Sequence, residues 1–223
     1  MSLAPPTFRP EDCRILSRET LWQGLFSVDR VTLEHARLEG RKDARVERIV
    51  FERGDSVGVL PYDPTTDTVV LVEQLRAGAL RDEHSPWLRE IIAGVVEPGE
   101  HDEAVARREA DEEAGAQLGE LLPIATYYPS PGACSERVQL FCARLLTAGD
   151  GGGYGRKNEA EDIRVHTVAR EDAIAALDAG WVTSSLTLIA LQWLALNADA
   201  LRNRWNGPGP TTTSEKNTLF QKA

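Results

Sequence analysis

Alternating apolar and polar positions predict a chain built mainly from short strands. In the amino-terminal part, strand-like runs stand between proline-rich and charged stretches. After residue 50 the runs become more apolar, as expected for strands inside a core. The strands predicted in this way are 25–33, 46–51, 57–60, 69–75, 90–96, 121–128, 138–145 and 163–168.

Three segments have a helical pattern instead. Residues 102–114 are rich in alanine, glutamate and arginine and are followed by Gly115, a common helix stop. Two further helices are predicted at 170–178 and 184–204. Polar residues interrupt the apolar segment 181–201, so we expect a helix with one buried face and no membrane span. The bulky residues predicted to form that face are Leu186, Ile189, Trp193, Leu196 and Leu201.

Strands interleaved with helices indicate an α/β (α+β) fold. We predict a small amino-terminal β appendage at 1–50, a main domain at 51–206 and a disordered tail at 207–223. The glycine-rich segment 149–157 is predicted to be a mobile loop. The appendage is too short and polar to form a core alone, which suggests that it serves an interface.

Composition narrows the function. The 223 residues include 35 acidic and 25 basic ones, which gives a net charge of −10. This charge disfavours general binding of nucleic acid and suits a protein that holds divalent cations. Three cysteines in no paired spacing argue against a disulfide framework. No secretion signal is visible, so we expect a soluble, cytoplasmic protein.

The segment 94–116 carries the candidate chemistry. On a helix, Glu109, Glu112 and Glu113 lie on one face, where three carboxylates repel one another unless a cation neutralises them. Arg108 offsets part of this charge. Because hard cations prefer oxygen ligands, Mg²⁺ is the natural neutraliser and Mn²⁺ a substitute.

The whole segment resembles the Nudix box, G-x5-E-x7-R-E-U-x-E-E-x-G-U, in which U is apolar. The resemblance implies a Nudix fold, a mixed β-sheet sandwiched between α-helices, and hydrolysis of a nucleoside diphosphate linked to another group. The matching positions are Gly94, Glu100, Arg108, Glu109, Ala110, Glu112, Glu113, Gly115 and Ala116.

Stretches outside the box, from FERGDSVGVLPYDP to EDIRVH and IALQWL, are similar to bacterial ADP-ribose pyrophosphatases. The resemblance implies cleavage of ADP-ribose to AMP and ribose 5-phosphate, and a homodimer with swapped amino-terminal segments. It also implies a catalytic base at Glu159 or Glu161. The implied metal site contains Ala93, Glu109, Glu112, Glu113 and Glu136, and the implied substrate contacts are Leu25, Phe26, Arg48, Arg76, Ser135 and Arg137.

Two positions depart from this pattern. Leu25 stands where relatives have an aromatic residue, and Ile49 stands where relatives can have a glutamate. Both positions keep open a different nucleotide-sugar substrate such as GDP-mannose. A non-catalytic ADP-ribose sensor is the remote alternative, disfavoured because all three box glutamates are retained.

Overall fold

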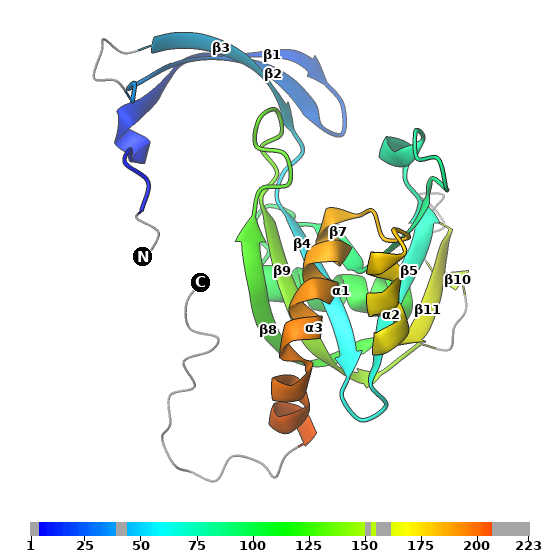
Figure 1. Ribbon diagram of the computed structural model, residues 1–223. Coiled ribbons are helices and arrows are strands. Elements are labelled where there is room, and N and C mark those ends of the chain that lie inside the picture. Colours follow the sequence, from blue (N-terminus) through cyan, green and yellow to red (C-terminus); the bar gives the residue numbers. More distant parts are fainter. Residues whose placement is uncertain (1–4, 39–43, 150–152, 155–161, 207–223) are drawn as a thin grey trace. The chain divides into compact units, whose positions relative to one another are not determined.

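The computed structural model describes residues 5–38, 44–149, 153–154 and 162–206 of the chain (Figure 1). It contains both strands and helices, as the sequence predicts. The elements are η1 (Pro10–Asp12), β1 (Cys13–Gln23), β2 (Ser27–His35), β3 (Ala44–Glu52), β4 (Ser56–Asp63), β5 (Thr68–Leu75), η2 (Ala77–Ala79), β6 (Trp87–Glu90), β7 (Ile92–Val95), α1 (Asp102–Ala114), β8 (Gln117–Tyr127), β9 (Val138–Thr147), β10 (Gly153–Tyr154), β11 (Ile163–Ala169), α2 (Arg170–Asp178) and α3 (Ser185–Asn206).

The chain divides into two compact units, and the larger one holds a mixed sheet. This unit comprises Asp55–Tyr127 and Arg137–Ala223. Its strand order is β10-β11-β5-β4-β9-β8, with β6 added to β5 and β7 added to β4. β4 and β9 run parallel, while the other paired strands run antiparallel. The central strand β4 is buried at every position but its last, as expected where both faces are covered.

Helices cover both faces of this sheet (Figure 1). On one face, Val57 and Val59 of β4 pack with Val105 and Ala110 of α1. On the other face, the alternate residue Leu60 packs in a second cluster with side chains of α2 and α3. The two-residue period of the strands thus builds two separate cores, and the predicted α+β sandwich is confirmed.

The smaller unit comprises Met1–Gly54 and Tyr128–Glu136. It contains an antiparallel sheet in the order β1-β2-β3. The loop before Glu136 is attached to the end of β3, because the Phe51 amide donates to the Ala133 carbonyl at 2.7 Å and the Ser135 amide donates to the Phe51 carbonyl at 3.1 Å. The division at residue 50 predicted from sequence stays a prediction, and the tail at 207–223 lies outside the described residues.

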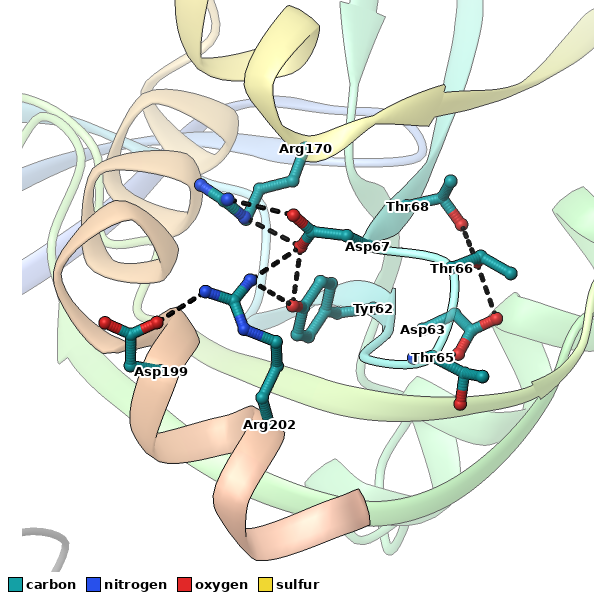
Figure 2. Close-up of polar contacts among 9 residues, drawn as sticks. All are labelled: Tyr62, Asp63, Thr65, Thr66, Asp67, Thr68, Arg170, Asp199 and Arg202. Atoms are coloured by element: carbon teal, nitrogen blue, oxygen red, sulfur yellow. Dashed lines mark hydrogen bonds and ion pairs between the residues drawn. The ribbon is translucent and has the colours of Figure 1, made fainter.

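A group of charged side chains, which we call the Asp67 clasp, joins the β4–β5 turn to α2 and α3 (Figure 2). The buried Tyr62 hydroxyl donates to Asp67 Oδ1 at 2.7 Å. Arg170 donates to both Asp67 oxygens at 2.8 and 2.9 Å, and Arg202 donates to Oδ1 at 3.1 Å. Asp67 has φ 55°, a left-handed conformation that aspartate tolerates in turns.

Three sequence predictions differ from the structure. The strand β1 is missing from the predicted set, because it is exposed along its whole length and has no buried face. The strand predicted at 90–96 is divided into β6 and β7 at Ile91, since β6 pairs with β5 and β7 pairs with β4. Within the predicted 149–157 loop, Gly153–Tyr154 forms the short strand β10 against β11.

The predicted buried face of α3 is partly wrong. Leu196 is 87% exposed, whereas the small residues Ala190 and Ala198 are buried. A pattern of bulky residues misses these alanines, which let the helix approach the sheet closely. The buried positions of α3 are Thr187, Ala190, Leu191, Leu194, Ala198, Leu201 and Trp205.

Across the described residues we find no helix that is both long and apolar enough to cross a membrane. The cytoplasmic location expected from the sequence stays a prediction.

Candidate active site

The strand β7 and the helix α1 bring the ends of the 93–116 segment together. Between them, Gly99 takes φ 91° and the Glu100 amide donates to the Glu97 carbonyl at 3.0 Å, so the chain turns tightly. The Ala93 amide then donates to Glu113 Oε2 at 3.3 Å. A carboxylate from the last turn of α1 therefore lies against the backbone of β7.

Gly94 makes room for a second carboxylate. A Cβ atom built on Gly94 would overlap the Cγ, Cδ and Oε1 atoms of Glu109. Gly94 has no positive φ, so the requirement for glycine at this position is space and not backbone conformation. The absence of a side chain at Gly94 thus leaves the space that the Glu109 side chain occupies.

Arg108 is the cation among these carboxylates. Its Nη1 donates to Glu109 Oε1 at 2.6 Å and to Glu112 Oε2 at 3.3 Å, while Nε and Nη2 each donate to Glu100 at 3.2 Å. Burial alone would lower the Arg108 pKa, but the hydrogen bonds and charges of Glu100 and Glu109 outweigh it and raise this pKa. Arg108 thus keeps its charge and offsets the acidic helix face.

These donors fit a hard divalent cation in type. Glu109 and Glu113 (the latter only 6% exposed) converge on the Ala93–Gly94 backbone, and all their donor atoms are oxygens. In the described part of the chain no three His, Cys, Asp or Glu side chains are already gathered in a metal-binding arrangement.

The helix ends where the sequence predicts. Gly115 takes φ 56°, its amide donates to the Asp111 carbonyl at 2.9 Å, and the Ala116 amide donates to the Ala110 carbonyl at 2.9 Å. This is a left-handed cap for which glycine is the favoured residue.

Comparison with known protein families identifies the family of this chain. The family model described as the NUDIX domain matches residues 52–185. This chain belongs to the Nudix family. The segment 94–116, which resembles a Nudix box, lies within the matched residues and contains α1.

Two kinds of curated relative are similar over most of their length. The chain is 42% identical over 201 residues to the ADP-ribose pyrophosphatase of Escherichia coli (strain K12), with 90% of this chain and 96% of that protein covered. It is 40% identical to the ADP-ribose pyrophosphatase of Haemophilus influenzae, covering 89% and 93%. It is 30% identical over 191 residues to the GDP-mannose pyrophosphatase of Salmonella arizonae, covering 84% and 97%.

A solved structure has the same fold. The crystal structure of an ADP compounds hydrolase aligns with a TM-score of 0.58 at 21% identity, covering 83% of this chain and 96% of that one. At this identity the likeness concerns the fold alone.

Two arginines expected to bind substrate have carboxylate partners in the Nudix domain. Arg76 donates from Nε to Glu90 Oε2 at 2.6 Å, and Glu90 is buried. Arg137 donates to Asp55 Oδ2 at 3.0 Å from Nε. Each arginine is thus held in place before any ligand is present.

Other expected site residues lie in the smaller unit. Leu25 is 90% exposed, while the Phe26 ring packs edge-on against Phe51 with centroids 5.5 Å apart. The Arg48 Nη1 donates to the Glu47 carbonyl at 2.8 Å. The Ser135 hydroxyl lies 3.4 Å from the Phe51 carbonyl, which it faces as a donor.

Glu136 is also in this unit and is buried. Its Oε1 lies 2.8 Å from Nη1 of Arg53. The Arg53 guanidinium in turn lies 5.7 Å above the Phe26 ring centroid, within the range of a cation–π contact. The two base candidates, Glu159 and Glu161, lie outside the described residues.

Sequence reasoning missed the partners of these residues. Glu90, Asp55 and Arg53 each hold an expected site residue, yet none belongs to the box pattern. Glu90 could have been suspected, because an acidic residue among apolar strand positions often faces a cation. Asp55 and Arg53 gave no such signal, since their partners are more than 80 residues away in the chain.

Proposed function

We propose that this Nudix hydrolase cleaves the diphosphate of ADP-ribose, giving AMP and ribose 5-phosphate, with Mg²⁺ as cofactor. The observation that carries the proposal is 42% identity over 201 residues to an ADP-ribose pyrophosphatase, nearly the full length of both chains. The carboxylates of Glu109 and Glu113, which lie against the backbone of β7, are oxygen donors of the kind that a Mg²⁺-dependent reaction needs.

A second candidate is a pyrophosphatase of another nucleotide sugar. GDP-mannose pyrophosphatases are 30% identical to this chain, and Leu25 offers no aromatic ring for a base. The larger identity over a longer alignment favours ADP-ribose.

We assign the roles as follows. Ala93, through its carbonyl, together with Glu109, Glu112, Glu113 and Glu136 would hold Mg²⁺, or Mn²⁺ in its place. The bound cation would mask the charge of the diphosphate and make water easier to deprotonate.

The other residues would act on the substrate and on water. Arg76 and Arg48 would bind the anionic diphosphate or the terminal ribose, and Arg137 would have to exchange Asp55 for substrate. Leu25, Phe26 and Ser135 would line the remaining substrate surface. Glu159 or Glu161 would accept the proton of the attacking water.

The experiment is phosphate release from ADP-ribose, coupled to a phosphatase, in parallel with GDP-mannose and ADP-glucose. We expect a clear preference for ADP-ribose with Mg²⁺ present. Glu113→Gln should lower kcat by about 100-fold, and one of Glu159→Gln and Glu161→Gln should also abolish turnover. A preference for GDP-mannose would overturn the substrate but not the family.

We also propose a homodimer formed through the amino-terminal sheet. The support is that β1 is exposed at all 11 positions and carries exposed apolar residues, including Ile15 at 58% and Trp22 at 56%. An outer strand of this kind is usually covered by a partner.

A further inference from the structure

Tyr154 contacts the end of the Nudix helix and belongs to no recognised motif. It is the second residue of β10, which pairs with β11 and contacts α1. Its partly buried side chain packs on the core cluster that contains Ala110 and Ala114 of α1. An aromatic ring therefore lies against the last turn of the helix.

The tyrosine hydroxyl lies between two glycines. A Cβ atom built on Gly115 would be 2.9 Å from the Tyr154 hydroxyl oxygen, 3.0 Å from Cε1 and 3.2 Å from Cζ. A Cβ atom built on Gly149 would overlap the same hydroxyl and the Ala114 carbonyl oxygen. Any larger residue at either glycine would push the ring or the helix end away.

The box glycine therefore meets two separate requirements. Its φ of 56° could be adopted by asparagine, which tolerates the left-handed region. Asparagine would not fit in the space beside Tyr154, however, because it has a Cβ atom. The need for glycine at 115 is steric as well as conformational.

The end of the helix also determines where Glu113 lies. Glu113 is two residues before Gly115, and its Oε2 accepts the Ala93 amide at 3.3 Å. The Glu113 side chain is nearly fully buried, so it has no room for a new rotamer that would compensate for a shift of the last turn. Such a shift would therefore move the Glu113 carboxylate away from β7.

We propose that Tyr154 is a positioning residue for the Nudix box. Its ring lies between Gly115 and Gly149 and holds the last turn of α1 in the position at which Glu113 contacts Ala93. It acts through Glu113 and does not touch the reacting atoms. The inference rests on the proposed function only in taking Glu113 as a metal ligand.

The test compares Tyr154→Ala with Tyr127→Ala. Tyr127 is also a partly buried tyrosine, but it packs in the core cluster on the opposite face of the sheet. Binding of Mn²⁺ is measured by the loss of the free-ion EPR signal, well below the melting temperature of either variant. We expect Tyr154→Ala to weaken Mn²⁺ binding about tenfold and Tyr127→Ala to leave it unchanged. Equal Mn²⁺ affinity in the two variants would overturn the proposal.

A second pair of variants tests the steric part without removing the ring. Gly115→Asn keeps the left-handed conformation and adds a Cβ atom, so we expect weaker Mn²⁺ binding. Adding Tyr154→Phe removes the atom closest to that Cβ and lets the ring move away from it, so it should restore part of the lost affinity. Wild-type affinity in Gly115→Asn, or no recovery in the double variant, would contradict the proposed packing.

Because these experiments measure Mn²⁺ binding directly, their result does not depend on which substrate the enzyme cleaves. Failure of ADP-ribose hydrolysis in the wild-type protein would refute the proposed function and leave the Tyr154 comparison valid. Unchanged Mn²⁺ binding with intact ADP-ribose hydrolysis would refute only the role of Tyr154.

Discussion

At the scale of single residues, the Nudix box depends on space as much as on charge. Gly94 is the clearest case, because the Glu109 side chain occupies the volume in which a Cβ atom would lie. The atoms displaced are Cγ, Cδ and Oε1 of Glu109, and all three belong to a side chain that can change rotamer. The fold can therefore adapt to a larger residue, whereas the carboxylate must move.

We predict that Gly94→Ala lowers kcat/KM by about 100-fold and lowers the free energy of unfolding by only about 1 kcal/mol. The cause is displacement of the Glu109 carboxylate from β7. Rate assays and thermal unfolding measure the two effects. Gly78→Ala is the matched control, because a Cβ atom on Gly78 meets nothing within 4 Å. Full activity in Gly94→Ala would show that Glu109 need not lie there.

The Asp67 clasp makes the stability of the protein depend on pH in the acidic range. The hydrogen bonds of Arg170, and then those of Tyr62, outweigh burial and lower the Asp67 pKa from 3.8 to about 2. In the unfolded chain Asp67 takes up its proton first, so its contribution is complete above pH 3.8 and is lost as the pH falls towards 2.

For Asp67→Asn we therefore expect the free energy of unfolding to fall less on acidification than in the wild-type protein. The difference should be about 1 kcal/mol, since Asp67 is about one-third exposed and its ion pairs are partly screened. Urea unfolding at pH 6 and pH 3 measures it. Asp199→Asn, which removes an exposed partner of Arg202, should leave the pH dependence unchanged. Parallel pH curves for wild type and Asp67→Asn would rule out this role.

At the scale of elements, α3 shows what the sequence could and could not predict. Its bounds were predicted to within two residues at either end, because a long apolar segment followed by a polar, proline-containing tail is distinctive. Its buried face was not, since the interface includes small residues. The helix α1 was predicted with its cap, whereas β1, exposed throughout, carries no buried periodicity.

The same distinction applies to the candidate site. The box glutamates are close in sequence, so a helical period was enough to put them on one face. The contacts of Glu113 with Ala93 and of Tyr154 with Gly115 depend on strand pairing and on close packing. Neither contact produces a periodic pattern in the sequence, so both could be identified only from the structure.

The α3 helix yields a paired prediction. Leu194→Ala should lower the free energy of unfolding by about 3 kcal/mol, because Leu194 is fully buried and its removal leaves a cavity. Leu196→Ala should change it by less than about 0.5 kcal/mol, because that side chain is exposed. Chemical denaturation of both variants measures the difference. Similar losses in the two would contradict the orientation of the helix.

At the scale of the whole molecule, the amino-terminal sheet is predicted to hold two copies together. Deletion of residues 1–48 should remove both the dimer and the activity. Trp22→Glu should weaken the dimer while leaving the sheet folded, since a charge on an exposed apolar strand opposes association. Sedimentation and rate assays measure both. Leu38→Glu, outside the strands, is the control, and a fully active monomer would refute the interface.

The parallel pairing of β4 with β9 has a consequence for how the chain is made. Ser56 pairs with Val138, so the whole Nudix box emerges from the ribosome before the centre of the sheet can close. β11, at Ile163–Ala169, must follow before β5, which pairs with β4 and β6, gains its third partner. A nascent chain that already carries every box residue is therefore still an open sheet with uncovered strand edges, and it needs protection from aggregation until nearly all of the domain has been synthesised.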